Sequence, residues 1–131
     1  MAHRLKAPYF RAFFQAPARG LPRRFAVVTA FNPRGRRASP AANARRDFAL
    51  RRRLDALGLA RFRVTGGSED GTHREPGWGF KCSPETARAL AAEFKQDAYY
   101  RISGGRIYLG CAAGGPLRRA GSWKARRARW S

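Results

Sequence analysis

Two helix-start signals of the same kind constrain the fold of this chain more than any other feature of its sequence. Ser39-Pro40 and Ser83-Pro84 each place a hydroxyl that can cap a helix directly before a proline. Proline suits the first turn of a helix because that position needs no N–H donor. Apolar residues at helical spacing follow both pairs, with Leu50 and Leu54 as the clearest example. The sequence therefore predicts two helices that each bury one face.

Five β-rich runs surround the two predicted helices. The runs are residues 25–31, 61–65, 76–82, 99–102 and 106–111. Gly104-Gly105 separates the last two runs and predicts a tight hairpin. The order β-α-β-β-α-β-β is typical of a single α/β sandwich. We therefore expect a ferredoxin-like (split βαβ) sheet with both helices on one face.

The net charge of +20 is unevenly distributed along the 131 residues. The first 46 residues carry 11 Lys and Arg and no acid, whereas residues 47–97 carry 9 basic and 8 acidic residues. From residue 98 onward there are 8 basic residues and again no acid. Such acid-free ends indicate a polyanionic partner. The pattern predicts a basic arm over 1–24, an α/β domain over 25–112 and a basic, Trp-containing tail over 113–131.

Signatures of familiar enzymes and metal sites are missing from the sequence. It has no phosphate-binding or dinucleotide-binding glycine loop and no Gly-x-Ser-x-Gly motif. The spacing of Cys82, Cys111, His3 and His73 does not match a zinc site. We therefore expect two free thiols, no metal, no cofactor and no catalytic residue.

The sequence also bears on where the protein works. No apolar stretch reaches the length of a membrane span, and the first residues lack the apolar core of a secretory signal. We expect a cytoplasmic protein. The basic, acid-free start of the chain, with Phe13 and Phe14, also resembles an organelle transit peptide in composition, and that alternative stays open.

Polar side chains gather where the first predicted strand passes into the first predicted helix. Thr29, Asn32 and Asn43 belong to this passage, beside a loop with three arginines. The end of a strand and the start of a helix often bind a ligand, and a phosphate suits the free N–H groups there. The same residues can instead serve the loop alone, and both interpretations stay open. Glu75 is expected to join the cluster or to pair with one of the arginines.

Short motifs in the middle of the chain resemble a bacterial family. These motifs are Thr29-Ala30-Phe31-Asn32-Pro33, then Asn43, then Arg74-Glu75-Pro76 leading to Phe80, and Phe94-Lys95-Gln96-Asp97-Ala98. In this order they resemble the family catalogued as domain of unknown function 3293, over roughly residues 25–111. The resemblance implies an α/β domain without an established activity. It also implies a shared polar set, which serves either a ligand or the fold. Its members are Thr29, Asn32, Asn43, Glu75 and Gln96.

The tail after residue 113 has the composition of a nucleic-acid-binding segment, because its basic residues alternate with Trp123 and Trp130. Basic groups neutralise phosphates, and aromatic rings between them stack on unpaired bases. The sequence lacks a helix-turn-helix or zinc-finger pattern, so we expect RNA rather than duplex DNA, with the ribosome as one candidate site. The predicted contacts are Arg34, Arg36, Arg37, Arg45, Arg52, Arg118, Arg119, Trp123, Lys124, Arg126, Arg127, Arg129 and Trp130.

Two alternative functions stay open beside RNA binding. One is a small enzyme that acts on a phosphorylated or nucleic-acid substrate through Asn32, Asn43 and Glu75. The other is an interaction module for an acidic partner. Phe48 bears on the choice, because its predicted place opposite the buried side of the helix fits either packing under an arm or stacking on a ligand. The oligomeric state is not predicted.

Overall fold

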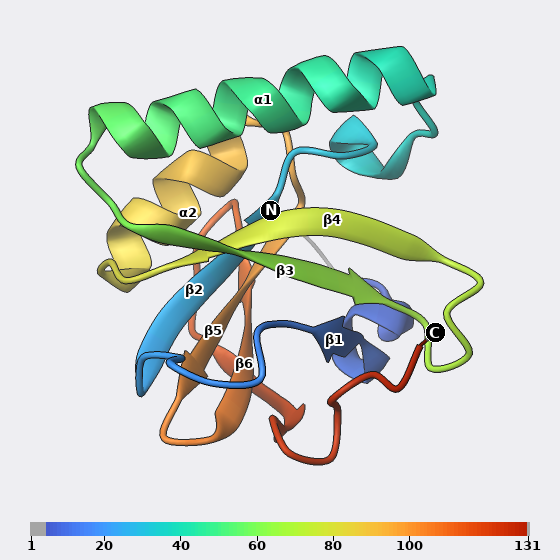
Figure 1. Cartoon of the computed structure of the whole chain (residues 1–131), viewed down its shortest axis with the longest axis vertical. Coiled ribbons are helices and arrows are strands. Elements are labelled where there is room, and N and C mark those ends of the chain that lie inside the picture. Colours follow the sequence, from blue (N-terminus) through green and yellow to red (C-terminus); the bar gives the residue numbers. More distant parts are fainter. Residues whose placement is uncertain (1–4, 131) are drawn as a thin grey trace.

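The computed structural model describes residues 5–130, so the ends of the predicted arm and tail, including His3 and Arg4, lie outside the described residues. Seven strands form one sheet (Figure 1). Their bounds are β1 Phe13–Gln15, β2 Arg24–Thr29, β3 Arg61–Gly67, β4 Arg74–Phe80, β5 Ala98–Ser103, β6 Arg106–Cys111 and β7 Arg118–Ser122. The five runs expected from the sequence are all strands, and the structure adds β1 and β7 from the two end segments.

Both predicted helices are present and begin where the Ser-Pro pairs predict. They are α1, Pro40–Ala56, and α2, Pro84–Glu93. The Ser39 hydroxyl accepts a hydrogen bond from the Ala42 N–H, and the Ser83 hydroxyl accepts one from the Thr86 N–H. These bonds satisfy N–H groups that the first turn of a helix leaves unpaired. Two short 3-10 helices, η1 (Ala7–Arg11) and η2 (Pro33–Gly35), precede β1 and α1.

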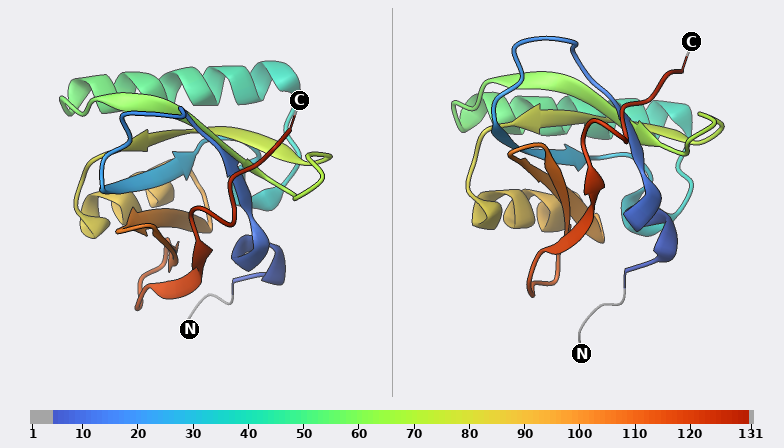
Figure 2. Two further views of the ribbon diagram at one scale, coloured as in Figure 1. Left: turned by 60° about the horizontal axis from the view of Figure 1, so that its bottom comes forward. Right: turned by 90° about the horizontal axis from the view of Figure 1, so that it is seen from below.

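The predicted ferredoxin-like sandwich with both helices on one face is wrong. The strands run in the order β1-β3-β4-β2-β5-β6-β7, every neighbouring pair is antiparallel, and the sheet curls into a half-barrel (Figures 1 and 2). Helix α1 contacts β4, whereas α2 contacts β2 and β5. The helices therefore lie along different parts of the curl rather than side by side on one flat layer.

The curled sheet contains one close approach of strands and one irregular strand pair. A Cβ on Gly77 would lie 2.8 Å from the Val28 carbonyl oxygen, so β4 approaches β2 more closely than any other residue would allow. On the other side of the sheet, the register between β6 and β7 shifts at Ile107/Tyr108. Such an irregularity increases the local twist of a sheet.

Each side of the curled sheet has its own apolar core. Alternate residues of β2 divide between them, with Ala26 and Val28 packed among the helices and Phe25 and Val27 packed on the concave side. The helical core includes Leu50 of α1 together with residues of α2. Neither α1 nor α2 packs on the concave side, and the two end segments of the chain, η1 included, supply its remaining apolar contacts.

The two ends of the chain meet across the open side of the half-barrel. Phe14 of β1 donates its N–H to the Arg126 carbonyl oxygen over 2.8 Å, and its own carbonyl oxygen accepts from the Ala128 N–H over 2.8 Å. The residues after β7 thus run parallel to β1. Figure 2 shows the C-terminal segment beside the N-terminal strand. Between residues 5 and 130, no helix is both long and apolar enough to cross a membrane.

Candidate functional site

The concave side of the sheet holds a cavity of about 850 Å³. Residues of η1 and of strands β1 to β5 line it, together with the β3–β4 loop. Gly66 and Gly77 are among the lining residues, and neither places a side chain in the cavity. Its volume lies in the range of pockets that enclose small organic ligands.

One wall of the cavity is aromatic and apolar. Tyr9, Phe13 and Phe14 belong to the N-terminal segment, and Tyr100 belongs to β5. Phe14 and Tyr100 are also part of the concave core. The Tyr100 hydroxyl donates to the Tyr9 carbonyl oxygen over 2.6 Å. Burial raises the pKa of Tyr100 well above the ordinary value of a phenol, so the hydroxyl stays a neutral donor. This bond fixes η1 over the cavity.

A second part of the cavity lining, called the polar wall here, includes four members of the predicted polar set. These four are Thr29, Asn32, Glu75 and Gln96. The fifth member, Asn43, is buried on α1 behind Asn32, with 7% of its surface exposed. The structure thus brings all five together, although only four face the cavity.

Asn32 is the centre of this polar wall. Its backbone adopts the left-handed conformation, with φ of 48°. Its N–H donates to the side-chain Oδ1 of Asn43 over 2.9 Å, and its own side-chain oxygen accepts from Asn43 Nδ2 over 3.0 Å. The same oxygen of Asn32 accepts from the Ala38 N–H. These bonds leave the Nδ2 of Asn32 directed at Glu75, 3.5 Å from Oε2.

Glu75 lies between Asn32 and His73. His73 Nε2 is 2.9 Å from Glu75 Oε2, and the side chains of His73 and Glu75 are 65% and 24% exposed. A carboxylate bonded to one ring nitrogen orients the imidazole and leaves the second nitrogen for another partner. The expectation that Glu75 joins the Asn cluster therefore holds, and the alternative of an ion pair with a loop arginine does not.

Thr29 and Gln96 complete the polar wall and also stabilise the loop that follows β2. The Thr29 hydroxyl donates to the Pro76 carbonyl oxygen over 2.7 Å. Gln96 Nε2 donates to the Phe31 carbonyl oxygen over 3.0 Å. The cluster therefore satisfies polar groups of the loop, as one of the two interpretations expects, and a ligand role for it stays a prediction.

A family model described as Protein of unknown function (DUF3293) matches residues 28–99. The chain belongs to this family. The match includes every member of the polar set, and the resemblance seen in the sequence is confirmed. No curated protein and no solved structure matches the chain.

The residues matched by the DUF3293 model include one wall of the cavity and leave out the other. Thr29, Asn32, Glu75 and Gln96 lie within the match, whereas the aromatic wall comes from η1, β1 and the second half of β5, beyond residue 99. The polar wall therefore belongs to the family domain. The segments outside the match close that domain into a cavity.

Three of the predicted tail contacts, Trp123, Arg126 and Arg127, pack against other parts of the chain. The Trp123 ring stacks on Phe14 at 5.5 Å between centroids and meets Phe25 edge-on at 5.4 Å. Arg126 donates to the Phe10 carbonyl oxygen, and Arg127 donates to that of Ala16. These three side chains hold the two ends of the chain together, and their role in nucleic-acid binding stays a prediction.

Trp130 packs on the loop between β3 and β4. Its indole N–H donates to the carbonyl oxygens of Ser68 and Glu69, and the Arg74 guanidinium lies 4.7 Å from its ring. Ser68 and Glu69 also line the cavity. The last described residue of the chain therefore supports the rim of the cavity.

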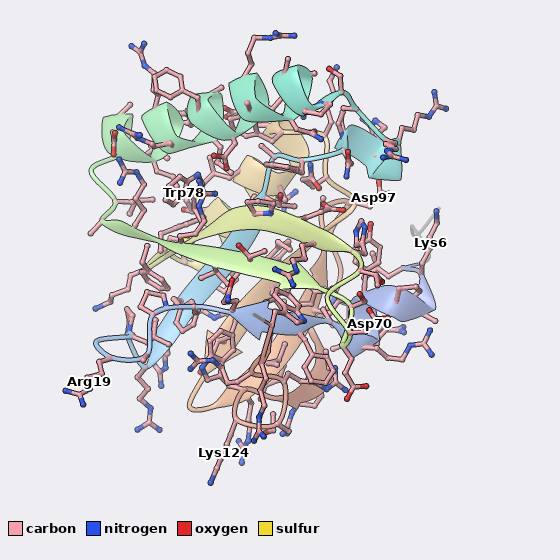
Figure 3. All side chains as sticks on the ribbon, turned by 45° about the vertical axis from the view of Figure 1, so that its right-hand side comes forward. Lys6, Arg19, Asp70, Trp78, Asp97 and Lys124 are labelled. Atoms are coloured by element: carbon pink, nitrogen blue, oxygen red, sulfur yellow. The ribbon has the colours of Figure 1, made fainter. Side chains whose placement is uncertain are left out.

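The remaining predicted contacts are exposed and lie on two separated surfaces. Arg34, Arg36 and Arg37 surround η2, and Arg45 and Arg52 continue on α1. Those on the second surface, β7 and the tail, are Arg118, Arg119, Lys124 and Arg129. Figure 3 shows basic side chains such as Lys6, Arg19 and Lys124 pointing outward from different sides. The structure therefore does not gather the basic residues into a single patch.

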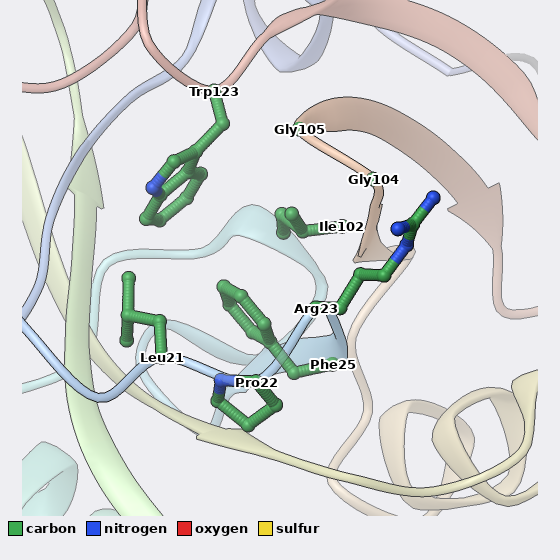
Figure 4. A pocket seen from close by; sticks show the side chains of 8 residues that line it. All are labelled: Leu21, Pro22, Arg23, Phe25, Ile102, Gly104, Gly105 and Trp123. Carbon is green, nitrogen blue, oxygen red and sulfur yellow. The ribbon is translucent and has the colours of Figure 1, made fainter.

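A second hollow, of about 410 Å³, lies beside the β5–β6 turn (Figure 4). Its walls are mainly apolar, with Leu21, Phe25, Ile102 and Trp123 as the large side chains. Among the described residues that line it, Arg23 alone is charged. With no converging set of polar groups, this hollow lacks the hydrogen-bonding pattern of a specific site.

Sequence reasoning did not assign His73, Tyr9 or Tyr100 to a site. Strand alternation was a usable signal for His73, because 73, 75 and 77 face one side of an extended segment. No local signal places Tyr9 in the same cavity as Glu75, since η1 reaches the cavity only by packing of the chain ends. Among residues 5–130, no three His, Cys, Asp or Glu side chains gather as metal ligands would.

Proposed function

We propose that this protein binds single-stranded nucleic acid, RNA rather than DNA, and takes one unpaired nucleotide into the concave cavity. The cavity carries the proposal. It combines about 850 Å³ of space, an aromatic wall and an amide-carboxylate wall in a chain with a net charge of +20. Unpaired bases are recognised in this way, by stacking on aromatic rings and by hydrogen bonds to their edges.

The two walls fit different parts of a base. Tyr9, Phe13 and Tyr100 offer aromatic surface for stacking. Glu75 and Asn32 offer an acceptor and a donor for the polar edge of the base. Because Glu75 is an anion when ionised, it favours the amino groups of a base and disfavours a phosphate inside the cavity.

The phosphates then belong outside the cavity, on the arginines around η2. Arg34, Arg36 and Arg37 are exposed, and Gly35 between them lines the cavity. Among residues 5–130, these three guanidinium groups make no ion pair. A base enclosed in a cavity must be unpaired, which supports a single strand over a duplex. Ribosomal RNA in the cytoplasm is one source of such strands.

Fluorescence anisotropy with a labelled 12-nucleotide RNA tests the proposal. Gly66→Val fills the cavity, and its Cβ would meet the Phe14 ring at an ordinary 3.5 Å, so the fold should tolerate it. We expect it to weaken binding about tenfold, since stacking contributes roughly 1–3 kcal/mol per base. Ala89→Val, on the exposed side of α2, is the matched control and should bind as the wild type does. Equal affinity of Gly66→Val and wild type would overturn the proposal.

The contact between His73 and Glu75 favours a second function, general-base catalysis on a phosphorylated or nucleic-acid substrate. The 2.9 Å contact orients the imidazole at the cavity rim, as a general base requires. Hydrolysis assays over RNA, DNA and nucleotides test it. Turnover that is lost in Glu75→Gln, with thermal unfolding unchanged, would support an enzyme, and no turnover by the wild type would exclude these substrates.

A further inference from the structure

The outer face of α1 carries a basic surface around one exposed aromatic side chain. We define the α1 outer face as Arg45, Phe48, Arg51 and Arg52. Phe48 is 52% exposed, and with Leu57 it is one of two large apolar side chains that are exposed within residues 5–130. The packing under an arm that the sequence left open is thus not realised. An aromatic ring exposed among arginines needs another explanation.

The arginines of this face have no acidic partners in the described part of the chain. The acids of α1 turn toward the sheet, where Asp47 pairs with Arg63 and Asp55 pairs with Arg61. Figure 3 shows Trp78 on this inward side, beneath the helix. The charge on the outer face is therefore left uncompensated, and it is available to an external anion.

The arginines also flank the Phe48 ring. The Arg51 and Arg52 guanidinium carbons lie 5.6 Å and 6.0 Å from the ring centroid. Arg45 precedes Phe48 by three residues and therefore lies on the same side of the helix. Cations around a flat apolar ring match a nucleotide, whose phosphate takes the cation and whose base takes the ring.

The segment between β2 and α1 connects the cavity lining to the start of the helix that carries this face. Asn32 and Gly35 line the cavity, and α1 begins at Pro40, only a few residues later. The arginines around η2 occupy the chain between the two. At about 1.5 Å per residue, Arg45 and Arg52 span roughly 10 Å along the helix, which suits two neighbouring nucleotides.

We propose that the α1 outer face binds the same RNA strand outside the cavity, with phosphates on Arg45, Arg51 and Arg52 and an unpaired base on Phe48. This inference rests on the proposed function. RNA is favoured over a lipid surface because an interfacial helix needs a continuous apolar face, whereas this one has a single ring among charges. The nucleotide in the cavity then fixes the position of the RNA, and α1 binds the part of the strand that adjoins it.

Two probes of different length test this inference, and both are measured by fluorescence anisotropy. One is a labelled mononucleotide, which fits the cavity alone, and the other is the 12-nucleotide RNA. Phe48→Ala should weaken binding of the RNA about tenfold and leave binding of the mononucleotide unchanged. Leu57→Ala, which removes the other exposed apolar side chain of the same helix region, is the matched control and should change neither affinity.

Charge is tested in a triple variant, Arg45→Gln, Arg51→Gln and Arg52→Gln. For a single strand, each lost phosphate contact reduces the slope of log affinity against log salt by about 0.7, so we expect a reduction of about 2. The affinity for the mononucleotide should not change. Vesicles of phosphatidylglycerol serve as the alternative anion, and tighter binding to them than to RNA, lost in the triple variant, would overturn the inference in favour of a membrane.

The outcomes separate this inference from the proposed function. If the wild type binds neither probe at low salt, both fail. Suppose that the RNA binds and that Gly66→Val weakens this binding, while Phe48→Ala and the triple variant do not. The proposed role of the α1 outer face is then overturned, and the proposed role of the cavity is kept. Because all four residues are exposed on a helix, these variants should fold as the wild type does, which circular dichroism checks.

Discussion

Asn43 on α1 holds Asn32 at the rim of the cavity through two reciprocal hydrogen bonds, one to the backbone N–H and one to the side-chain oxygen of Asn32. This pair couples the start of α1 to the loop after β2. It keeps Asn32 in a left-handed conformation, which an asparagine adopts more readily than most residues. The polar wall of the cavity therefore depends on a residue that does not line it.

Removal of the amide of Asn43 tests that dependence. Asn43→Ala leaves the Asn32 N–H without its partner, and an unpaired polar group of this kind costs about 2 kcal/mol. We expect the free energy of unfolding to fall by about that amount in urea denaturation. Gln15→Ala, an exposed amide on β1, is the control and should stay within about 0.5 kcal/mol of the wild type. Equal stability of both variants would contradict the role of Asn43.

Trp123 is predicted to behave as a core residue although it belongs to the basic tail. Its ring packs between Phe14 and Phe25, so Trp123→Ala should destabilise the protein by about 3–4 kcal/mol. Lys124→Ala, at the exposed neighbouring position, should change stability by less than about 0.5 kcal/mol. Thermal unfolding compares the two. A small effect of Trp123→Ala would mean that the tail is not part of the concave core.

The loop between β3 and β4 should lose stability in acid. The Thr72 N–H and the hydroxyls of Ser68 and Thr72 lower the pKa of Asp70 to about 2. A carboxyl whose pKa is depressed by folding stabilises the folded state above its unfolded pKa, and this stabilisation is lost as the pH falls toward 2. Asp70→Asn should therefore lower the melting temperature at pH 6, and the difference from wild type should shrink between pH 4 and pH 2. Glu69→Gln, which removes the adjacent charge, should not show this convergence.

Cys82 should react slowly with alkylating reagents at neutral pH. Burial raises the pKa of its thiol to about 11, against the opposing effect of Arg101. Because only the thiolate reacts, the alkylation rate of Cys82 in a Cys111→Ser variant should be about a hundredfold below that of a free thiol at pH 8. The rate should rise until about pH 11. A half-maximal rate near pH 8.5, in a protein shown to be folded, would contradict the predicted burial.

The elements that the sequence predicted are those with local causes. Ser39-Pro40 and Ser83-Pro84 start both helices, and Gly104-Gly105 forms the β5–β6 turn, because capping and turn chemistry act within a few residues. The curl of the sheet had no such local cause. The curled sheet also includes β7, whose sequence, rich in arginine and glycine, does not favour a strand.

The candidate site was predictable in part for the same reason. The polar set follows from the family motifs, and the structure brings its members together. The aromatic wall was not predictable, because Tyr9 and Phe14 reach the cavity only through contacts with Tyr100 and the residues after β7. The place of the tail was not predictable either, because Arg126 and Arg127 donate hydrogen bonds to carbonyl oxygens of the N-terminal segment, far away in the sequence.

Photo-crosslinking tests the central claim most directly. A 12-nucleotide RNA with one 4-thiouridine is irradiated with the protein at low salt, and the cross-linked residues are mapped by mass spectrometry. Binding of a nucleotide in the concave cavity predicts cross-links within residues 8–14 or 66–77, which disappear in Gly66→Val. Cross-links confined to residues 113–131, or none at all, would contradict it.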